Sequence, residues 1–215
     1  DFINDWEGLK TGSLVLGGSN LFSSWFLPPM IAEFASCYPH IQIRLVEEST
    51  VKLTKMLQRG IIDMVLDNTN LDPEIFDSRL YQEEHLILAV PRSFSINKKL
   101  ENFQLSVPDI QTGRFLAPDF PSVPFSQFRK EPFIMLKQEN DTGKRAMDIC
   151  RENHFEPIVV FEMDQQMTSY NVTCSGMGIS FIGDIMISKV SPHPNVVYYK
   201  LPLKDNCRNI CFYWK

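Results

Sequence analysis

The feature that most constrains the fold is a strand–helix–strand–helix–strand pattern within residues 12–66. Three short apolar segments, 14–16, 41–46 and 61–66, have the composition of strands, and segment 41–46 also alternates apolar with polar side chains. Helical periodicity fills the two stretches between them, and Gly60 is a suitable C-terminal stop for the second helix. Consecutive units of this kind are right-handed βαβ crossovers, so the pattern predicts an α/β fold with a parallel sheet.

The turn after the first strand and the helix that follows carry clear local signals. We expect Gly17-Gly18 to end the strand in a turn, and Ser19 or Asn20 to cap the next helix. Pro28-Pro29 is expected to kink that helix or restart it early.

The second half of the chain repeats the same logic less regularly. We expect strands at 86–90, 133–136, 158–161, 179–182, 196–199 and 210–214, helices at 142–153 and 165–175, and a proline-rich mixture of short helix and loop over 100–132. Two α/β lobes, with the chain crossing between them, account for this order. Ligands of open parallel sheets bind beyond the carboxyl ends of the strands, so those positions are the places to search for a site.

Composition excludes several classes of protein. The net charge of the 215 residues is −5, with both signs interspersed and no basic stripe that would bind nucleic acid. The longest apolar runs, such as 86–90, are far too short to span a bilayer. Residues 1–7 lack the basic start and apolar stretch of a signal peptide, which favours a cytoplasmic location.

The cysteines and histidines predict neither a disulfide framework nor a metal site. An odd number of cysteines without regular spacing favours a reducing compartment. Cys207-x-x-x-Cys211 is the closest pair, but no second pair or histidine cluster completes a zinc site, so we expect no metal and no cofactor. The residues concerned are Cys37, Cys150, Cys174, Cys207 and Cys211, with His40, His85, His154 and His193.

An ordered set of residues with particular spacings resembles the effector-binding domain of LysR-type bacterial transcription regulators. The set consists of Gly12-Ser13-Leu14-Val15-Leu16-Gly17, Leu27-Pro28, Phe34, Tyr38-Pro39-His40-Ile41-Gln42-Ile43, Glu47, Leu53, Leu57, Gly60, Ile62-Asp63-Met64 and Gly176-Met177-Gly178-Ile179-Ser180-Phe181-Ile182. The resemblance extends from about residue 10 to residue 215.

This resemblance implies a type 2 periplasmic-binding-protein-like fold, in which two Rossmann-like lobes are hinged by two crossing strands. Lobe one would comprise 10–82 plus 189–215, lobe two 83–188, and 1–9 would be the end of a linker. A small-molecule effector would bind in the cleft between the lobes. DNA would be bound only through an N-terminal helix-turn-helix that this sequence does not include, so we expect the regulatory half of the protein.

The family also forms homodimers or tetramers through this domain, by packing a lobe-one helix against a lobe-two strand. The candidate segments here are the helix at 22–34 and the strand at 133–136 or its neighbours.

In lobe one, polar residues follow each of the three predicted parallel strands. Free N–H groups and the positive end of a helix dipole attract an anion at such turns, and a hydroxyl adds a donor. Helix capping is the alternative role for the serines and the threonine. The candidate effector-binding residues are Ser19, Asn20, Ser49, Thr50, Asp67 and Asn68.

In lobe two, Asn140 and Thr142 precede or open a helix, where capping is again the alternative. Phe161, Glu162 and Met163 end a predicted strand and complete the candidate set. An acidic cleft formed by Asp67 and Glu162 would suit a polar or cationic effector better than a dicarboxylate.

No catalytic motif occurs in the sequence, so we expect no enzyme activity and no catalytic residue. We interpret Glu83-Glu84-His85 as a solvated hinge surface. Peroxide sensing through a thiol pair, known in one branch of the family, is disfavoured because the position nine residues before Cys150 is Asp141. The alternative function is a transporter's solute-binding protein with the same two-lobe fold.

Overall fold

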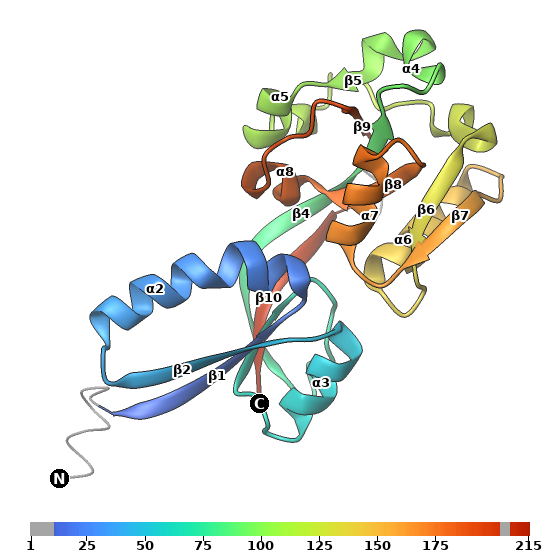
Figure 1. Cartoon of the computed structure of the whole chain (residues 1–215). Helices are drawn as coiled ribbons and strands as arrows, with labels where there is room; N and C mark the ends of the chain where they lie inside the picture. The colour runs from blue at the N-terminus through green and yellow to red at the C-terminus, as the bar shows by residue number, and fades with distance from the viewer. Residues whose placement is uncertain (1–10, 203–206) are drawn as a thin grey trace. The chain divides into compact units, whose positions relative to one another are not determined.

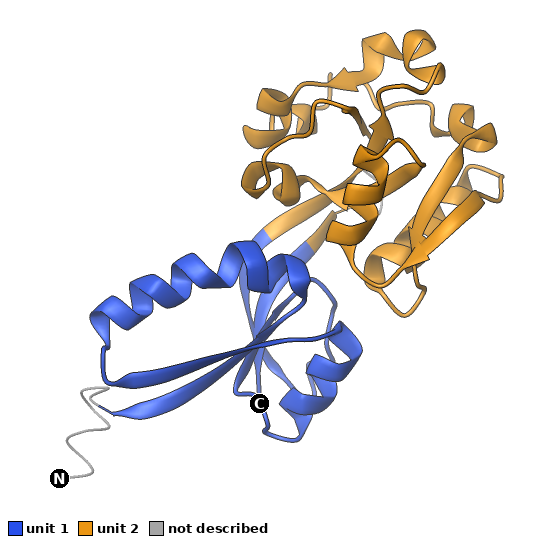
Figure 2. Ribbon diagram, viewed as in Figure 1, with its two compact units in different colours: residues 1–82, 209–215 blue, residues 83–208 orange. Residues whose placement is uncertain are grey.

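The computed structural model describes residues 11–202 and 207–215, so the expected linker end at 1–9 lies outside the described residues. The chain divides into two compact units, residues 1–82 with 209–215 and residues 83–208 (Figure 2). Residues 189–208 belong to unit 2, whereas the sequence analysis assigns them to lobe one. The physical reason is that β9 (Val196–Lys200) pairs with β4 (Asp77–Pro91) along five residue pairs.

Unit 1 contains the predicted parallel βαβ units. Strand β1 pairs in parallel with β2 on one side and with β3 on the other, and β3 pairs antiparallel with β10. The elements are β1 (Gly12–Gly18), η1 (Phe22–Phe26), α2 (Leu27–Cys37), β2 (Ile41–Glu47), α3 (Thr50–Gln58), β3 (Met64–Asp67) and β10 (Cys207–Trp214). The carboxyl ends of β1, β2 and β3 therefore lie at the same edge of the sheet.

Two local expectations for unit 1 need correction. Gly17 and Gly18 lie inside β1 and do not form the turn. A Cβ at Gly17 would come within 2.9 Å of the side chains of Leu53 and Ile62, so the glycine permits close packing of α3 against the strand. The third strand begins at Met64 because residues 61–63 form a bend, in which the Asp63 carboxylate accepts a hydrogen bond from the backbone N–H of Val15 at 2.7 Å.

The first helix is interrupted as its prolines predict. The π-helical turn η1 leads directly into α2, and Pro28 and Pro29 in the first turn of α2 lack the N–H groups that would donate to the preceding turn. Within α2, Leu27 is the buried residue, while Met30, Ile31 and Phe34 are half-exposed.

Unit 2 is built on the second sheet, in the order β4-β8-β6-β7, with β9 paired to β4 and to β5. The short helix α8 was not predicted. The elements after β4 are α4 (Ile96–Lys99), η2 (Glu101–Phe103), β5 (Gln104–Leu105), α5 (Val107–Gln111), η3 (Arg114–Leu116), η4 (Phe125–Lys130), β6 (Pro132–Leu136), α6 (Asp141–Glu152), β7 (Ile158–Met163), α7 (Gln166–Cys174), β8 (Ile179–Gly183), α8 (Asp184–Lys189) and β9.

The sequence analysis proposed strand β6 as a candidate dimer-forming strand. In the structure β6 is paired in parallel on both sides, with β7 and with β8. Residues 133–136 are all buried. The neighbouring strand β7 is at the end of the sheet order and exposes Ile158, Val159 and Val160.

The two crossing strands implied by the resemblance are β4 and β10. Strand β4 runs for 15 residues through the boundary between residues 82 and 83, and β10 passes from Cys207 and Arg208 of unit 2 into unit 1 (Figure 1). Within the described residues, no helix combines the length and the apolar character needed to cross a membrane.

An aromatic cluster forms the centre of the unit 2 core. The ring of Phe133 lies 6.2 Å from that of Phe125, 6.2 Å from that of Phe155 and 6.1 Å from that of Phe181. Phe133 itself is completely buried. Aromatic pairs at these separations add to the stabilisation from burial alone.

We predict that Phe133→Ala destabilises unit 2 by about 3–5 kcal/mol, because it leaves a cavity among three aromatic rings. Urea denaturation followed by far-ultraviolet circular dichroism measures the loss. Met177→Ala, at a side chain that is about half exposed, is the control and should change the free energy of unfolding by about 0.5 kcal/mol or less. Equal effects of the two substitutions would contradict this description of the core.

Candidate functional site

Three turns at the carboxyl ends of β1, β2 and β3 form the candidate site in unit 1. Each predicted residue pair lies at or near the end of its strand: Ser19-Asn20 directly after β1, Ser49-Thr50 one residue beyond β2, and Asp67-Asn68 at the end of β3. Because these strands are parallel neighbours, the structure brings the three pairs to one edge of the sheet.

A hydrogen bond joins two of the turns. The hydroxyl of Thr50 donates to the carboxylate of Asp67 at 2.9 Å, and the backbone N–H of Thr69 donates to the other carboxylate oxygen at 2.8 Å. Asp67 is 1% exposed. Its carboxylate therefore has protein donors at both oxygens and fixes the start of α3 relative to the end of β3.

The capping alternative fails for Ser49 at this edge. Ser49 is the N-cap residue of α3 but makes no side-chain capping bond. Ser19 directly precedes the helix that begins at Asn20, and its carbonyl accepts a hydrogen bond from the backbone N–H of Ser23 at 2.8 Å. Asn20 instead donates from its amide to the Glu47 carboxylate at 3.1 Å, which links the ends of β1 and β2. The Ser49 hydroxyl is thus not committed to capping, and Asn68, which follows β3, is half-buried.

In unit 2, the capping alternative holds for Asn140. Its side-chain oxygen accepts a hydrogen bond from the backbone N–H of Thr142 at 2.9 Å, at the start of α6. Thr142 is buried, and its hydroxyl accepts a hydrogen bond from Arg208 at 2.7 Å. A Cβ at Gly143 would overlap the carbonyl oxygens of Leu136 and Lys137, so this glycine lets α6 begin directly against the end of β6.

The remaining predicted residues end strand β7. Glu162 is exposed, whereas Phe161 and Met163 are half-buried. Met163 pairs with Leu136 of β6, and its carbonyl accepts a hydrogen bond from Lys137 at 3.0 Å. The structure therefore brings Met163 to the turn that leads into Asn140.

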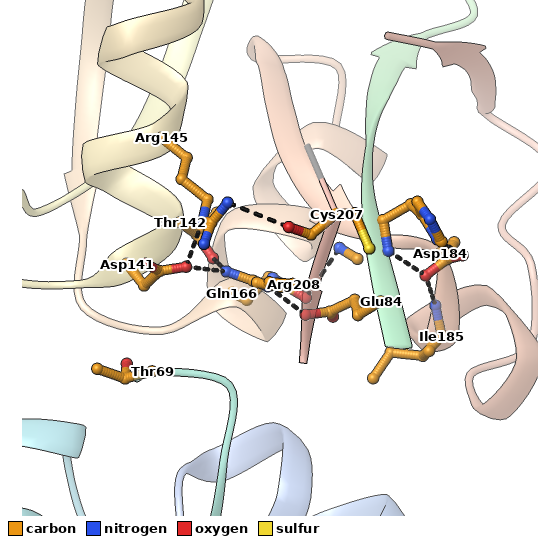
Figure 3. A network of polar contacts seen from close by, with 12 residues as sticks. Thr69, Glu84, Asp141, Thr142, Arg145, Gln166, Asp184, Ile185, Cys207 and Arg208 are labelled. Atoms are coloured by element: carbon orange, nitrogen blue, oxygen red, sulfur yellow. Dashed lines mark hydrogen bonds and ion pairs between the residues drawn. The ribbon is translucent and has the colours of Figure 1, made fainter. Parts of the chain in front are cut away.

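A buried charge network at the start of α6 was missed from the sequence (Figure 3). Arg208 of β10 forms an ion pair with Glu84 of β4, and both residues are almost fully buried. Arg208 also donates to Asp141 at 3.1 Å, and Asp141 in turn accepts from Arg145 at 2.7 Å. No local sequence pattern predicts this network, because its residues on β4 and β10 are far apart in the sequence.

The interpretation of Glu83-Glu84-His85 as a solvated hinge surface is wrong for Glu84. Successive side chains of a strand point to opposite faces. Glu83 is exposed and His85 is half-buried, whereas Glu84 between them is completely buried against Arg208. The apolar run 86–90 after this segment was the sequence signal that β4 enters a core, and the structure buries it.

The thiols give no support to peroxide sensing. Burial raises the pKa of the Cys150 thiol to about 12, which keeps it protonated and poorly nucleophilic. The side chain nine residues earlier, Asp141, is held in ion pairs with Arg145 and Arg208.

The chain matches the family model described as the LysR substrate binding domain over residues 7–215. The chain belongs to this family. It is the effector-binding domain of a LysR-type transcription regulator and not an enzyme, as the sequence predicted. The match gives no support to the alternative of a transporter's solute-binding protein.

Comparison with individual proteins agrees with the family. The LysR-type domain is 25% identical, over 188 residues, to the uncharacterized HTH-type transcriptional regulator YcgK of Bacillus subtilis, covering 87% of this chain and 56% of YcgK. The chain thus spans little more than half the length of this relative.

Two solved structures show the shared fold. The CcmR regulatory domain of Synechocystis, in complex with 2-PG, matches with a TM-score of 0.72 and 16% identity, covering 94% of this chain and 87% of that one. The BenM effector binding domain with its effector benzoate matches with a TM-score of 0.68 and 18% identity, covering 96% and 84%.

We predict that Arg208→Met destabilises the LysR-type domain by about 3–5 kcal/mol, because it leaves the buried Glu84 carboxylate without its cation. Thermal or urea denaturation measures the loss. Arg151→Met is the matched control, since Arg151 forms an exposed pair with Asp148 at 2.8 Å and should contribute about 1 kcal/mol or less. A small effect of Arg208→Met, similar to that of the control, would show that the buried pair is dispensable.

Proposed function

We propose that a small polar effector binds at the edge of unit 1 where β1, β2 and β3 end. The observation that carries this proposal is the convergence of three polar turns at one sheet edge, joined by the Thr50–Asp67 and Asn20–Glu47 hydrogen bonds. Preorganised donors and acceptors of this kind fix the orientation of a small ligand. The Ser49 hydroxyl, which makes no capping bond, and the Ser19 hydroxyl supply additional donors.

The effectors of structural relatives support a small-molecule ligand. BenM binds benzoate and the CcmR domain is in complex with 2-PG. The start of α3 provides backbone N–H groups for a carboxylate or phosphate. Contacts from Asn140, Thr142, Phe161, Glu162 and Met163 of unit 2 to the same effector stay a prediction of the sequence analysis.

In the whole regulator, we propose that effector binding alters DNA binding by a helix-turn-helix outside this chain, in the cytoplasm. A ligand shifts a conformational equilibrium by the difference between its affinities for the two states. The chain passes between its units through β4 and β10, so these two strands connect a bound effector to any such change.

We also propose that the LysR-type domain forms a homodimer through β7 and α2. Ile158, Val159 and Val160 are between 43% and 51% exposed on a strand at the end of its sheet. An apolar edge strand of this kind favours pairing with another chain. The half-exposed apolar residues of α2 offer a second surface for a partner to cover.

We predict that a panel of small carboxylates, phosphates, amines and sugars contains a ligand that raises the melting temperature of the chain. At 100 times its dissociation constant, such a ligand adds about 2.7 kcal/mol to the free energy of unfolding. Thr50→Val and Ser19→Ala should each weaken binding about tenfold, because each removes a hydroxyl from the site. Calorimetric titration measures the affinities.

The matched control for this experiment is Thr54→Val, one turn further along α3, where the hydroxyl donates to the Thr50 carbonyl at 2.9 Å. This variant should bind the ligand as tightly as the unmodified chain. A ligand whose affinity is unchanged by Thr50→Val and Ser19→Ala would contradict the proposed site.

We predict that Val159→Asp converts a dimer of the chain into a monomer in sedimentation experiments, because it introduces charge into an apolar edge. Val51→Asp is the matched control, since Val51 on α3 is 44% exposed and Val159 is 45% exposed. The control should leave the dimer intact. A monomeric unmodified chain, or a Val159→Asp variant that stays dimeric, would overturn the proposed interface.

A further inference from the structure

Three side chains that ligate metals lie together on the crossing strands of unit 2. One ligand atom from each of Glu83, His85 and Cys207 lies within 4.8 Å of the others. Glu83 and Cys207 are exposed and His85 is half-buried, so the cluster is open to solvent on one side. The sequence analysis expected no metal site because it found no local ligand spacing.

The pairing of the strands explains why these three residues meet. Strands β4 and β10 are hydrogen-bonded neighbours. Side chains alternate along each strand, so Glu84 and Arg208 form their ion pair on one face, while Glu83, His85 and Cys207 share the other. In Figure 3 the sulfur of Cys207 is directed toward β4. The buried ion pair thus fixes the register that assembles the cluster.

His85 is held in position by Asp184. The backbone N–H of His85 donates to Asp184 at 2.9 Å, and the ring Nδ1 lies 3.4 Å from the other carboxylate oxygen of Asp184. The ring also makes an edge contact with Phe115 at 6.3 Å. A carboxylate on one ring nitrogen orients a histidine so that the other nitrogen can bind a metal.

We propose that Glu83, His85 and Cys207 form a binding site for a zinc ion. A thiolate, an imidazole and a carboxylate are the three ligand types that zinc binds in proteins, and three such ligands leave one position open. Magnesium and calcium prefer all-oxygen sites, so the thiol excludes them as the preferred ions. This proposal does not depend on the proposed effector site.

The separations between the three ligand atoms and the charges near Cys207 are compatible with a bound zinc ion. Ligands of tetrahedral zinc lie about 3.5 Å apart, given metal–ligand distances of about 2.0–2.3 Å. Torsional movement of the exposed Glu83 and Cys207 side chains is enough to reach this from the observed separation. The carboxylates of Glu83 and Asp184 both place negative charge near Cys207, and a bound dication offsets that charge.

We predict that the chain binds Zn²⁺, and Co²⁺ as its spectroscopic substitute, with one ion per chain. Thiolate ligation gives cobalt a sulfur-to-metal charge-transfer band in the near ultraviolet. Cys207→Ser should abolish this band, and Cys207→Ser and Glu83→Gln should each weaken zinc binding at least tenfold. Asp184→Asn should weaken it about 10- to 100-fold, as expected for a residue that orients a ligand.

Cys37→Ser is the matched control, because Cys37 is also an exposed free cysteine and lies on α2 of unit 1. It should retain the charge-transfer band and the zinc affinity. Circular dichroism of each variant without metal reports whether the fold is intact, and Cys207→Ser and Glu83→Gln change exposed side chains. Absence of the band in the unmodified chain, or its persistence in Cys207→Ser, would overturn the proposal.

Discussion

The buried ion pair between Glu84 and Arg208 is the interaction on which the organisation of unit 2 depends. Its members stand on β4 and β10, the two strands through which the chain passes between its units. An ion pair that is buried away from water is stable only when both partners are present and further hydrogen bonds satisfy their remaining polar atoms. Arg208 obtains those bonds from Asp141 and Thr142, so the crossing strands and the start of α6 share a single polar network.

Much of the fold could be predicted because its information is local. Hydrophobic periodicity predicted β2 and α6 to within about two residues, and Gly60 correctly indicated where α3 ends. The extent of β4 could not be predicted in this way. Its residues 77–85 are polar and exposed for the most part, and they form a strand because distant segments pair with them. Helix α8 is six residues long, too short to show a helical period.

The candidate site was predicted as a set of positions, but not as a set of interactions. Strand order alone brings Ser19, Ser49 and Asp67 to one edge, since each lies at or just beyond the carboxyl end of a parallel strand. Whether a side chain there is available to a ligand depends on partners that sequence does not reveal. Asp67 is buried and accepts hydrogen bonds from Thr50 and Thr69, and Thr142 on α6 is bonded to Arg208 on β10, 66 residues away in sequence.

The small buried surface of α2 lowers the local stability of this helix. An isolated helix of its length is marginal in water, and Leu27 at its first position is its single buried residue. Amide hydrogens of the later turns should therefore exchange with solvent faster than those near Leu27. A partner that covers Met30, Ile31 and Phe34 binds only when the helix is formed, so its binding free energy stabilises the later turns of α2. Helix formation in this segment and association with a partner are therefore thermodynamically linked.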